Sequence, residues 1–363
     1  YCCFRTFYTC YNLLFVLHWI RFKVKPNLSI LTEKEFPTMV TIRDIARETN
    51  VSPTTVSNVI HGRDGRVSAE TIELINDTIK RLGYVPNMSA RSLVSNSSRV
   101  IGFVNHVVTR ENTNVMEDPF HSTAIGTIET ALRENNYYLM LRTVTTAEEL
   151  VTFLQNWNVD GLFFTGIFKD KFFDSVAGLN IPVVLIDSYV KSNQFCNVGL
   201  EDFTGSYQAT QYLIQRGHKC IAFASPNIKD GGVLQERFLG YKAALADNAI
   251  PFDKTLVFQQ EMDIESCKKV SAEIAKHPGI TGLVVTADIM AAGIMTGLRE
   301  QGLKVPDDIS VVGFDDIPMA QLITPPLTTI HQDMNLKGRL AVCSSFCRKI
   351  RCPPTKSFSL SAS

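Results

Sequence analysis

The sequence lacks an excess of charge of either sign, because 36 lysine and arginine residues balance 36 aspartate and glutamate residues. Proteins that coat nucleic acid without sequence preference are strongly basic, so this balance excludes that class. The chain has 363 residues and a hydrophobic fraction of 45%, which suffices for two or three domains with cores of their own.

The sequence also lacks the local signatures of common enzyme classes. It contains no P-loop, no G-x-S-x-G elbow, no H-E-x-x-H helix and no glycine fingerprint for a dinucleotide. His106, His121 and His218 are scattered, with no evident pairing of a nucleophile and a base. We therefore expect no catalytic residue and no cofactor.

Cysteine is scarce in the long middle of the chain, where only Cys196, Cys220 and Cys267 occur. This usage is ordinary for a reducing cytosol, and a cytoplasmic protein is expected. The other cysteines lie near the two ends. Those near the carboxyl end have no histidine among them and do not complete a four-ligand set, so we expect no metal site.

No apolar run is long enough to span a bilayer. The best candidate, residues 11–20, is too short and is interrupted by Asn12 and His18, so no membrane partner is expected. A signal peptide fits poorly because no small-residue cleavage site follows. Since Met39 is the first methionine, we expect translation to start there and residues 1–38 to be upstream sequence read in frame; a membrane anchor is the alternative.

What the sequence does contain is a pair of short helical patterns joined by a tight turn, in TIRDIARETNVSPTTVSNVIHG from Thr41. Thr41 is a good N-cap, and Ser52 followed by Pro53 fits the start of a second helix. A third pattern covers residues 68–83. We predict a small all-α helix-turn-helix domain over residues 39–84.

The second helical pattern carries short, uncharged, hydrogen-bonding side chains where a solvent-facing helix would usually carry Lys and Glu. Such groups can contact base edges in the DNA major groove. The alternative is a capped helical hairpin with no role in DNA binding. Because the domain is only slightly basic, useful affinity would need a dimer on two half-sites. The candidate DNA contacts here are Thr41, Ser52, Pro53, Thr54, Thr55, Ser57 and Asn58.

From Val100 onward, short apolar runs of buried-strand type alternate with helical stretches. The first strands are expected in RVIGFV, YYLMLRT, DGLFFT and PVVLID, with helices at 121–134, 147–156 and 169–178. After Asn193 we expect helices at 203–216, 235–248, 264–276 and 289–301, and strands at 220–224, 255–258, 282–285 and 310–314. Alternation of this kind predicts parallel sheets, here in two open α/β lobes over residues 100–342.

Two such lobes bind a ligand in the cleft between them, near the carboxyl ends of strands. Charged acceptors, a bidentate donor and a flat ring are what a polyhydroxylated sugar needs. The candidates at such positions are Phe120, His121, Asp187, Arg237 and Asp315. Simpler interpretations exist: Asp315 could cap the next turn, Arg237 could form a surface salt bridge, and Phe120 could lie in the core.

Six segments of the sequence are informative when they are taken in their order along the chain: TIRDIARETNVSPTTVSNVIHG, LGYVPNMSARSL, RVIGFV, RGHKCIAF, ERFLGY and ISVVGFDDIPMAQLITPPLTTIHQD. In this order they closely resemble the lac repressor (LacI/GalR) family of bacterial transcription regulators, over about residues 40–342. The resemblance implies a repressor whose core has two periplasmic-binding-protein-like, Rossmann-like lobes. It also implies a homodimer on double-stranded operator DNA, controlled by a small-molecule effector.

In that family, the segment that matches residues 85–99 is a hinge helix that folds on the operator. One leucine of the hinge wedges into a base step of the minor groove and bends the DNA. The resemblance assigns this wedge to Leu93, with Ala90 and Arg91 as its neighbours. A flexible tether is the alternative interpretation of this segment.

The resemblance also implies that Arg237 and Asp315 contact the effector and that Phe120 and His121 are the aromatic residues of the cleft. Asp187 matches the family pattern less securely. Ala287 stands where the family usually has Asn, which removes one possible hydrogen bond. No arginine occurs where purine-responsive members place one, so a sugar is the expected effector. Inducer and corepressor remain equally open.

The resemblance stops after Val342, where the helix begun by GRLAV should continue and then return a strand to the second lobe. The chain instead has CSSFCRKIRCPPTKSFSLSAS, without an apolar period. Residues 343–363 are therefore expected to be an aberrant sequence, from a frame shift or a composite, or a divergent disordered tail. Either would weaken dimerisation. A secreted sugar-binding protein would share the two lobes but would lack the helices of residues 41–82.

Overall fold

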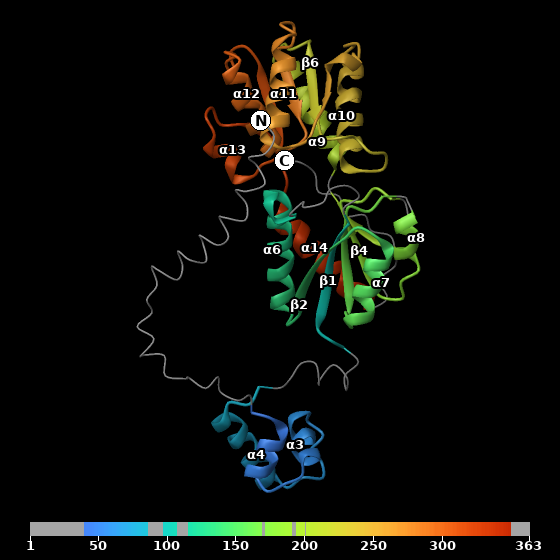
Figure 1. Ribbon diagram of the computed structural model, residues 1–363, viewed down its shortest axis with the longest axis vertical. Helices are drawn as coiled ribbons and strands as arrows, with labels where there is room; N and C mark the ends of the chain where they lie inside the picture. The colour runs from blue at the N-terminus through green and yellow to red at the C-terminus, as the bar shows by residue number, and fades with distance from the viewer. Residues whose placement is uncertain are drawn as a thin grey trace, which may run out of the picture. The chain divides into compact units, whose positions relative to one another are not determined.

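The computed structural model describes residues 40–85, 97–106, 115–168, 171–190, 194–199 and 201–349. The chain forms two compact units that divide after Asn87, and each is described by itself (Figure 1). The predictions for residues 1–38, for the wedge residue Leu93 with Ala90 and Arg91, and for residues 350–363 lie outside the described residues. Within the described ranges, no helix has the length and apolar character needed to cross a membrane.

The first unit consists of three short helices, α2 (Ile42–Glu48), α3 (Pro53–Ile60) and α4 (Ala69–Leu82). Ile45, Val56 and Ile75, one from each helix, are fully buried and form the centre of its core. The helix α4 ends at Gly83, which has a φ of 65°, a conformation that glycine adopts without strain. The helix-turn-helix fold predicted from the sequence is confirmed.

The second unit begins with an open parallel sheet in the order β2-β1-β3-β4-β5, which we call lobe 1. The strands are β1 (Val100–His106), β2 (Tyr138–Val144), β3 (Gly161–Thr165), β4 (Val183–Ile186) and β5 (Cys196–Val198). The helices between them are η1 (Val115–Glu117), α6 (Pro119–Glu134), α7 (Ala147–Asn156) and α8 (Lys171–Ala177). Just before β1, the backbone N–H of Ser98 donates to Asp160 (2.8 Å), so the end of the predicted hinge is bonded to this lobe.

A second parallel sheet, in the order β10-β9-β8-β6-β7, forms lobe 2. Its strands are β6 (Ile221–Ser225), β7 (Val257–Gln259), β8 (Gly282–Val285), β9 (Ser310–Asp315) and β10 (Thr328–His331). Its helices are α9 (Asp202–Gln215), α10 (Val233–Asp247), η2 (Lys254–Leu256), α11 (Ile264–Ala275), α12 (Asp288–Glu300) and α13 (Pro318–Leu322). The two lobes and their parallel strands were predicted, whereas η2 occupies part of the strand expected at 255–258.

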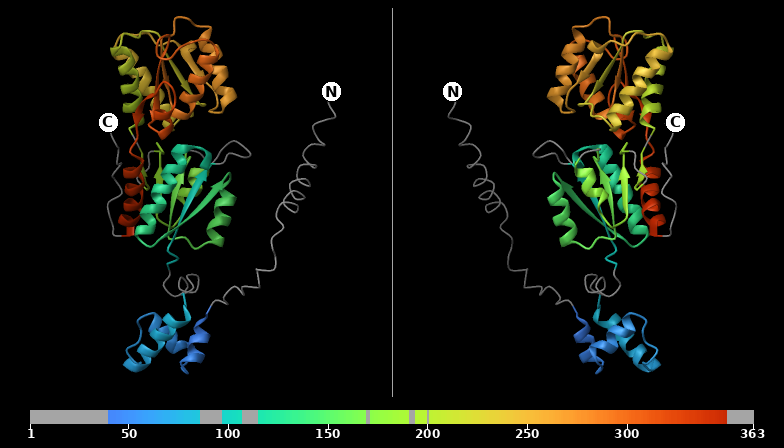
Figure 2. Two further views of the ribbon diagram at one scale, coloured as in Figure 1. Left: turned by 90° about the vertical axis from the view of Figure 1, so that its left-hand side faces the viewer. Right: turned by 90° about the vertical axis from the view of Figure 1, so that its right-hand side faces the viewer.

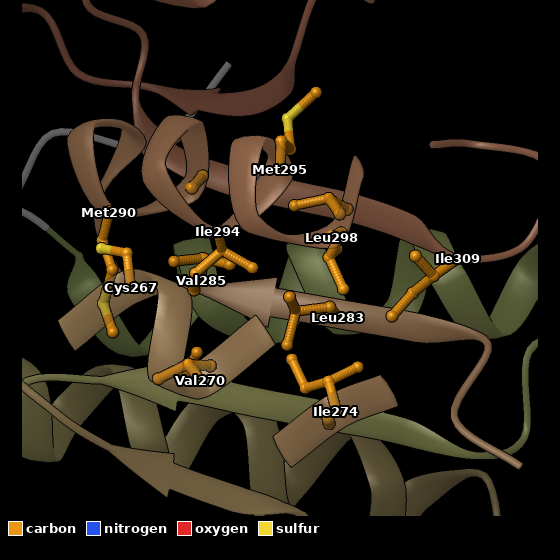
Figure 3. Packing of buried hydrophobic residues seen from close by; sticks show 14 of the residues in the cluster. Cys267, Val270, Ile274, Leu283, Val285, Met290, Ile294, Met295, Leu298 and Ile309 are labelled. Carbon is orange, nitrogen blue, oxygen red and sulfur yellow. The ribbon is translucent and has the colours of Figure 1, made fainter. Parts of the chain in front are cut away.

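The core of lobe 2 shows why the apolar runs of the sequence become buried strands. Figure 3 shows side chains of α11, α12 and β8 meeting, among them Val270, Ile294 and Leu283. The helices α11 and α12 approach so closely that a Cβ on Gly293 would lie 2.8 Å from the sulfur of Cys267. Glycine is therefore needed at this crossing.

The chain passes between the lobes twice, from β5 to α9 and back from β10 to α14 (Met334–Lys349). The helix α14 packs beside α6 and against β3, β4 and β5, so the carboxyl-terminal helix belongs to lobe 1 (Figures 1 and 2). The sequence after Val342 predicts an aberrant or disordered tail over residues 343–363. The helix instead continues to Lys349, because no proline or glycine interrupts the sequence before Pro353.

Candidate functional site

In the first unit, the candidate DNA contacts lie on and around α3. The Ser52 hydroxyl accepts a hydrogen bond from the backbone N–H of Thr55 (3.0 Å), and Pro53 occupies the first turn. Val56 and Val59 are buried in the core of this unit. This orientation leaves the polar side of α3 at the surface.

That surface is polar but uncharged. Thr54 is exposed, and Ser57 and Asn58 are partly exposed. Because they lie three and four positions from Thr54, these three side chains share one face of the helix. No acidic residue opposes a phosphate on α3 itself, so the helix can approach DNA without charge repulsion from its own side chains.

Thr41 has a structural role that the sequence had also indicated. The Asp44 backbone N–H donates to the Thr41 hydroxyl oxygen (3.3 Å), and the Thr41 backbone N–H donates to the Asp44 carboxylate (2.9 Å), which makes a capping box at the start of α2. The Thr41 hydroxyl also donates to that carboxylate (2.7 Å). The two hydrogen bonds that Thr41 donates to the carboxylate, from its hydroxyl and its backbone N–H, lower the pKa of Asp44 from its ordinary value. A DNA contact by Thr41 stays a prediction.

In the second unit, a cavity of about 280 Å³ lies between lobe 1 and lobe 2, at the carboxyl ends of the strands. All five candidate effector residues border it: Phe120, His121, Asp187, Arg237 and Asp315. Apolar side chains such as Ile167, Phe168 and Met262 make up much of the remaining wall. The structure therefore brings together residues that lie far apart in the sequence, while their contact with an effector stays a prediction.

Arg237, on the second turn of α10, is the centre of the lobe 2 wall. Its Nε lies 2.7 Å from Asp202 Oδ1, and its guanidinium carbon lies 3.7 Å from the centroid of the Phe314 ring. It also donates to the backbone carbonyl of Thr286. The side chain is only 7% exposed, so the alternative of a surface salt bridge is wrong.

Asp315 ends β9 beside Arg237, with 3.7 Å between Oδ1 and the guanidinium nitrogen. Its φ of 116° is rarely adopted by an L residue, which marks a strained position at the cleft. Burial raises the pKa of Asp315 well above its ordinary value, although the Arg237 charge acts in the opposite direction. No side chain caps the next helix, α13, so Asp315 does not have the capping role considered as its alternative.

The lobe 1 wall contains a carboxylate–imidazole pair at the start of α6. Asp118 caps this helix through the backbone N–H of Phe120 (2.9 Å), and its other oxygen lies 2.5 Å from Nδ1 of His121. Burial tends to raise the pKa of Asp118, but the hydrogen bond and charge of His121 outweigh it and the pKa is lowered. The cap explains why α6 begins at Pro119, two residues earlier than expected.

Three further residues of the cleft network were missed by the sequence analysis. Asp202 pairs with Arg237, Gln332 donates to Asp315 Oδ1 (2.6 Å), and Lys337 of α14 pairs with Asp187. Lys337 is a lysine on a helix face with buried Met334 and Ala341. That interruption of an apolar face was the one local signal that could have identified it.

Two polar atoms at the cavity wall have no hydrogen-bond partner among the described residues. They are Oδ1 of Asp187 and Oγ1 of Thr286. Buried polar atoms normally have partners, so both are available to hydroxyl groups of a bound molecule. Ala287 also borders the cavity and, as expected from the sequence, offers no polar side chain. The described residues hold no group of three or more His, Cys, Asp or Glu placed to bind a metal ion.

Comparisons with known proteins agree with both halves of this geometry. Residues 41–87 match the model for bacterial regulatory proteins of the lacI family, and residues 210–344 match the periplasmic binding protein-like domain. The chain is similar to the HTH-type transcriptional repressor PurR of Vibrio atlanticus (strain LGP32). The two are 32% identical over 312 residues, which cover 84% of this chain and 90% of that protein.

Two solved structures resemble the chain over nearly its whole described length. One is a complex of the transcriptional regulator CelR with cellobiose, with a TM-score of 0.63, 28% identity, and coverage of 88% of this chain and 96% of that chain. The other is a Lac repressor dimer bound to operator and the anti-inducer ONPF, with a TM-score of 0.74, 25% identity, and coverage of 86% and 93%.

Proposed function

Because this chain belongs to the lacI family of bacterial regulatory proteins, we propose that it is a transcriptional repressor whose operator affinity is controlled by a sugar bound between its two lobes. The observation that carries the proposal is the combination of two surfaces in one chain. The helix α3 presents an uncharged polar face, and a separate cavity gathers an arginine, carboxylates and an aromatic ring.

The DNA-binding half of the proposal rests on α3. Hydroxyl and amide side chains such as those of Ser57 and Asn58 can make hydrogen bonds to base edges in the major groove. The similar Lac repressor structure is a dimer bound to operator, and we extend this arrangement to two copies of the present chain.

The effector half rests on the chemistry of the cavity. Arg237 is a fixed donor, Asp187 and Asp315 are acceptors, and the Phe120 ring offers a flat apolar face. Hydroxyl groups and the C–H face of a sugar ring match these groups. The similar CelR structure contains cellobiose, which supports a sugar as the class of ligand here.

The function can be tested by selecting bound fragments from a fragmented bacterial genome with the purified full chain. The proposal expects enrichment of a palindromic sequence over random competitor DNA. A matched variant in which Ser57 and Asn58 are both replaced by Ala should enrich nothing. Equal recovery of all fragments by the unsubstituted chain at low salt would refute the DNA-binding half.

A further inference from the structure

We propose that Lys337 is a specificity-determining residue of the cleft. By holding one oxygen of Asp187, it leaves the other oxygen to accept a hydrogen bond from a ligand hydroxyl, and the cleft therefore selects uncharged sugars over phosphorylated ones. The inference rests on the proposed function, since it concerns the same cavity. It adds a residue and a charge preference that the function does not itself require.

The position of Lys337 is unusual for a lysine. Its side chain is only 2% exposed, and its ammonium group is paired with Oδ2 of Asp187. The same ammonium lies 4.7 Å from the centroid of the Phe120 ring, which borders the cavity. A buried lysine is costly unless it is paired, so these contacts fix both its place and that of its partner. Lys337 therefore acts on the ligand through Asp187 and Phe120.

The backbone conformation of Asp187, as well as its ion pair with Lys337, fixes the orientation of its side chain. It follows β4 with a φ of 53°, a left-handed conformation that Asp and Asn tolerate better than most residues. Its Oδ1 is buried and has no partner among the described residues, and Asp187 as a residue borders the cavity. A carboxylate oxygen left in this state is destabilising until a donor reaches it. A ligand O–H would supply that donor.

The residues that hold the two cleft acids come from one short stretch of chain. Gln332 donates to Asp315 on the lobe 2 side (2.6 Å), and Lys337, five residues later, pairs with Asp187 on the lobe 1 side. This stretch is the passage from β10 back to α14. A single segment therefore supplies a partner to both acids, which ties Lys337 to the cleft through Asp187.

The charge of the cavity wall disfavours an anionic ligand. On the wall, Arg237 is shared between Asp202 and Asp315, and His121 is bonded to Asp118. Lys337 does not itself border the cavity, and it is paired with Asp187, which does. Arg237, Lys337 and His121 therefore each already have a carboxylate partner. A phosphate group would be repelled by the carboxylates of the wall and would gain no new ion pair. A neutral hydroxyl group would not be repelled.

Lys229 is a second lysine near the cavity and the alternative partner for a phosphate group. Lys229 lies 5.6 Å from the centroid of the Phe168 ring, which borders the cavity, but Lys229 itself does not border it. If a phosphorylated sugar were the true ligand, Lys229 would be the cation within reach. Replacing Lys229 by Met is therefore the variant that identifies this alternative.

The probes are three pairs: glucose and glucose 6-phosphate, ribose and ribose 5-phosphate, and cellobiose and its 6-phosphate. Binding of each to the purified full chain is measured by titration calorimetry. For at least one pair, the neutral sugar is expected to bind at least tenfold more tightly than its phosphate. The deciding quantity is the ratio of the phosphate Kd to the neutral Kd.

Two variants of the ion pair should move this ratio in different directions. Asp187→Asn keeps the backbone conformation but removes a negative charge and releases Lys337, so the ratio should fall at least tenfold. Lys337→Met keeps the length of the side chain but leaves Asp187 unpaired, so the ratio should hold or rise while neutral sugars bind more weakly. A merely structural role would move both variants the same way.

Lys242→Met is the matched control, because Lys242 also lies beside aromatic rings, 5.1 Å from the Phe252 centroid, but not at the cavity. Its ratio should equal that of the unsubstituted chain. The inference is overturned if a phosphate binds more tightly than its neutral partner and Lys229→Met abolishes that binding. It is equally overturned if both ion-pair variants shift the ratio alike or if no neutral probe binds. Operator selection in the same preparations separates these outcomes from a failure of the proposed function.

Discussion

The helix α3 gathers its candidate contacts from one short stretch of the chain, whereas the cleft gathers its own from segments as far apart as Phe120 and Asp315. The polar groups of α3 are exposed or partly exposed and carry no charge. Those of the cleft are charged or paired with one another, and the central pair, Arg237 and Asp315, is buried. The first surface depends on an outside partner for its hydrogen bonds, and the second already holds most of its own.

This difference determines what a substitution does in each region. A polar side chain of α3 contributes little to folding, because water replaces its contacts in the free protein. A charged side chain of the cleft is part of the interior, and removing it leaves a buried partner without its counter-charge. A substitution on α3 should therefore change DNA binding without changing stability, whereas a substitution in the cleft should change both ligand binding and stability.

The largest expected effect is that of Arg237→Met. The variant leaves Asp202 and Asp315 facing each other without a cation, and breaking a buried pair in this way costs about 3–5 kcal/mol. The midpoint of denaturant unfolding of the second unit should fall accordingly. Lys242→Met is the control and should shift the midpoint little. A stable Arg237→Met protein would show that the cleft is not integral to the fold.

The next effect is a dependence of folding on pH that arises in lobe 2. Burial raises the pKa of Asp288 to about 6 from an ordinary 3.8, although Thr329 (2.6 Å) and the Ile317 backbone donate to its oxygens. The folded protein therefore holds the proton more tightly than the unfolded chain. The protonated Asp288 therefore contributes its full stabilisation below about pH 4. As the pH rises through 6, the free energy of unfolding falls by about 3 kcal/mol.

Urea unfolding of the second unit between pH 4 and pH 7 measures this loss, and Asp288→Asn should flatten the profile. The helix α3 holds no titratable side chain, so α3 itself should contribute no such pH dependence to the unfolding of the first unit. An identical slope in the parent and in Asp288→Asn would assign the pH dependence to another group.

The smallest effect on folding, and a large one on function, is expected from Asn58→Ala. Losing an amide contact to a base should weaken operator binding by about 1–3 kcal/mol, while the free energy of unfolding should change by about 0.5 kcal/mol or less. Fluorescence anisotropy with the selected duplex measures the first quantity and thermal unfolding the second. A large loss of stability with unchanged DNA binding would reverse the contrast between the two regions.

The sequence predicted the first unit well because its determinants are local. Thr41 and Ser52 each cap a helix as their spacing indicated, and the buried residues follow the helical period. The alternation of strands and helices in the second unit was likewise local and was confirmed. Its candidate residues were found because strand ends converge at one edge of a parallel sheet.

What the sequence could not provide is the set of partners that hold those residues. Lys337 pairs with Asp187 across 150 positions of the chain, and Gln332 reaches Asp315 only because β10 lies beside β9. The end of α14 at Lys349 was likewise not evident from the sequence. The loss of an apolar period after Val342 indicated a break, but a helix needs only residues that can remain helical, and none before Pro353 prevents it.

The most direct test of the account is whether a sugar bound in the cleft changes the affinity of the first unit for DNA. Anisotropy of the selected duplex is measured with the full chain, with and without a saturating concentration of the neutral sugar identified by calorimetry. The account predicts a change in operator Kd of about 5-fold to 150-fold, in the range typical of coupled sites, and a higher sugar concentration for the same change in a chain carrying Asp187→Asn. The same Kd with and without sugar would contradict it.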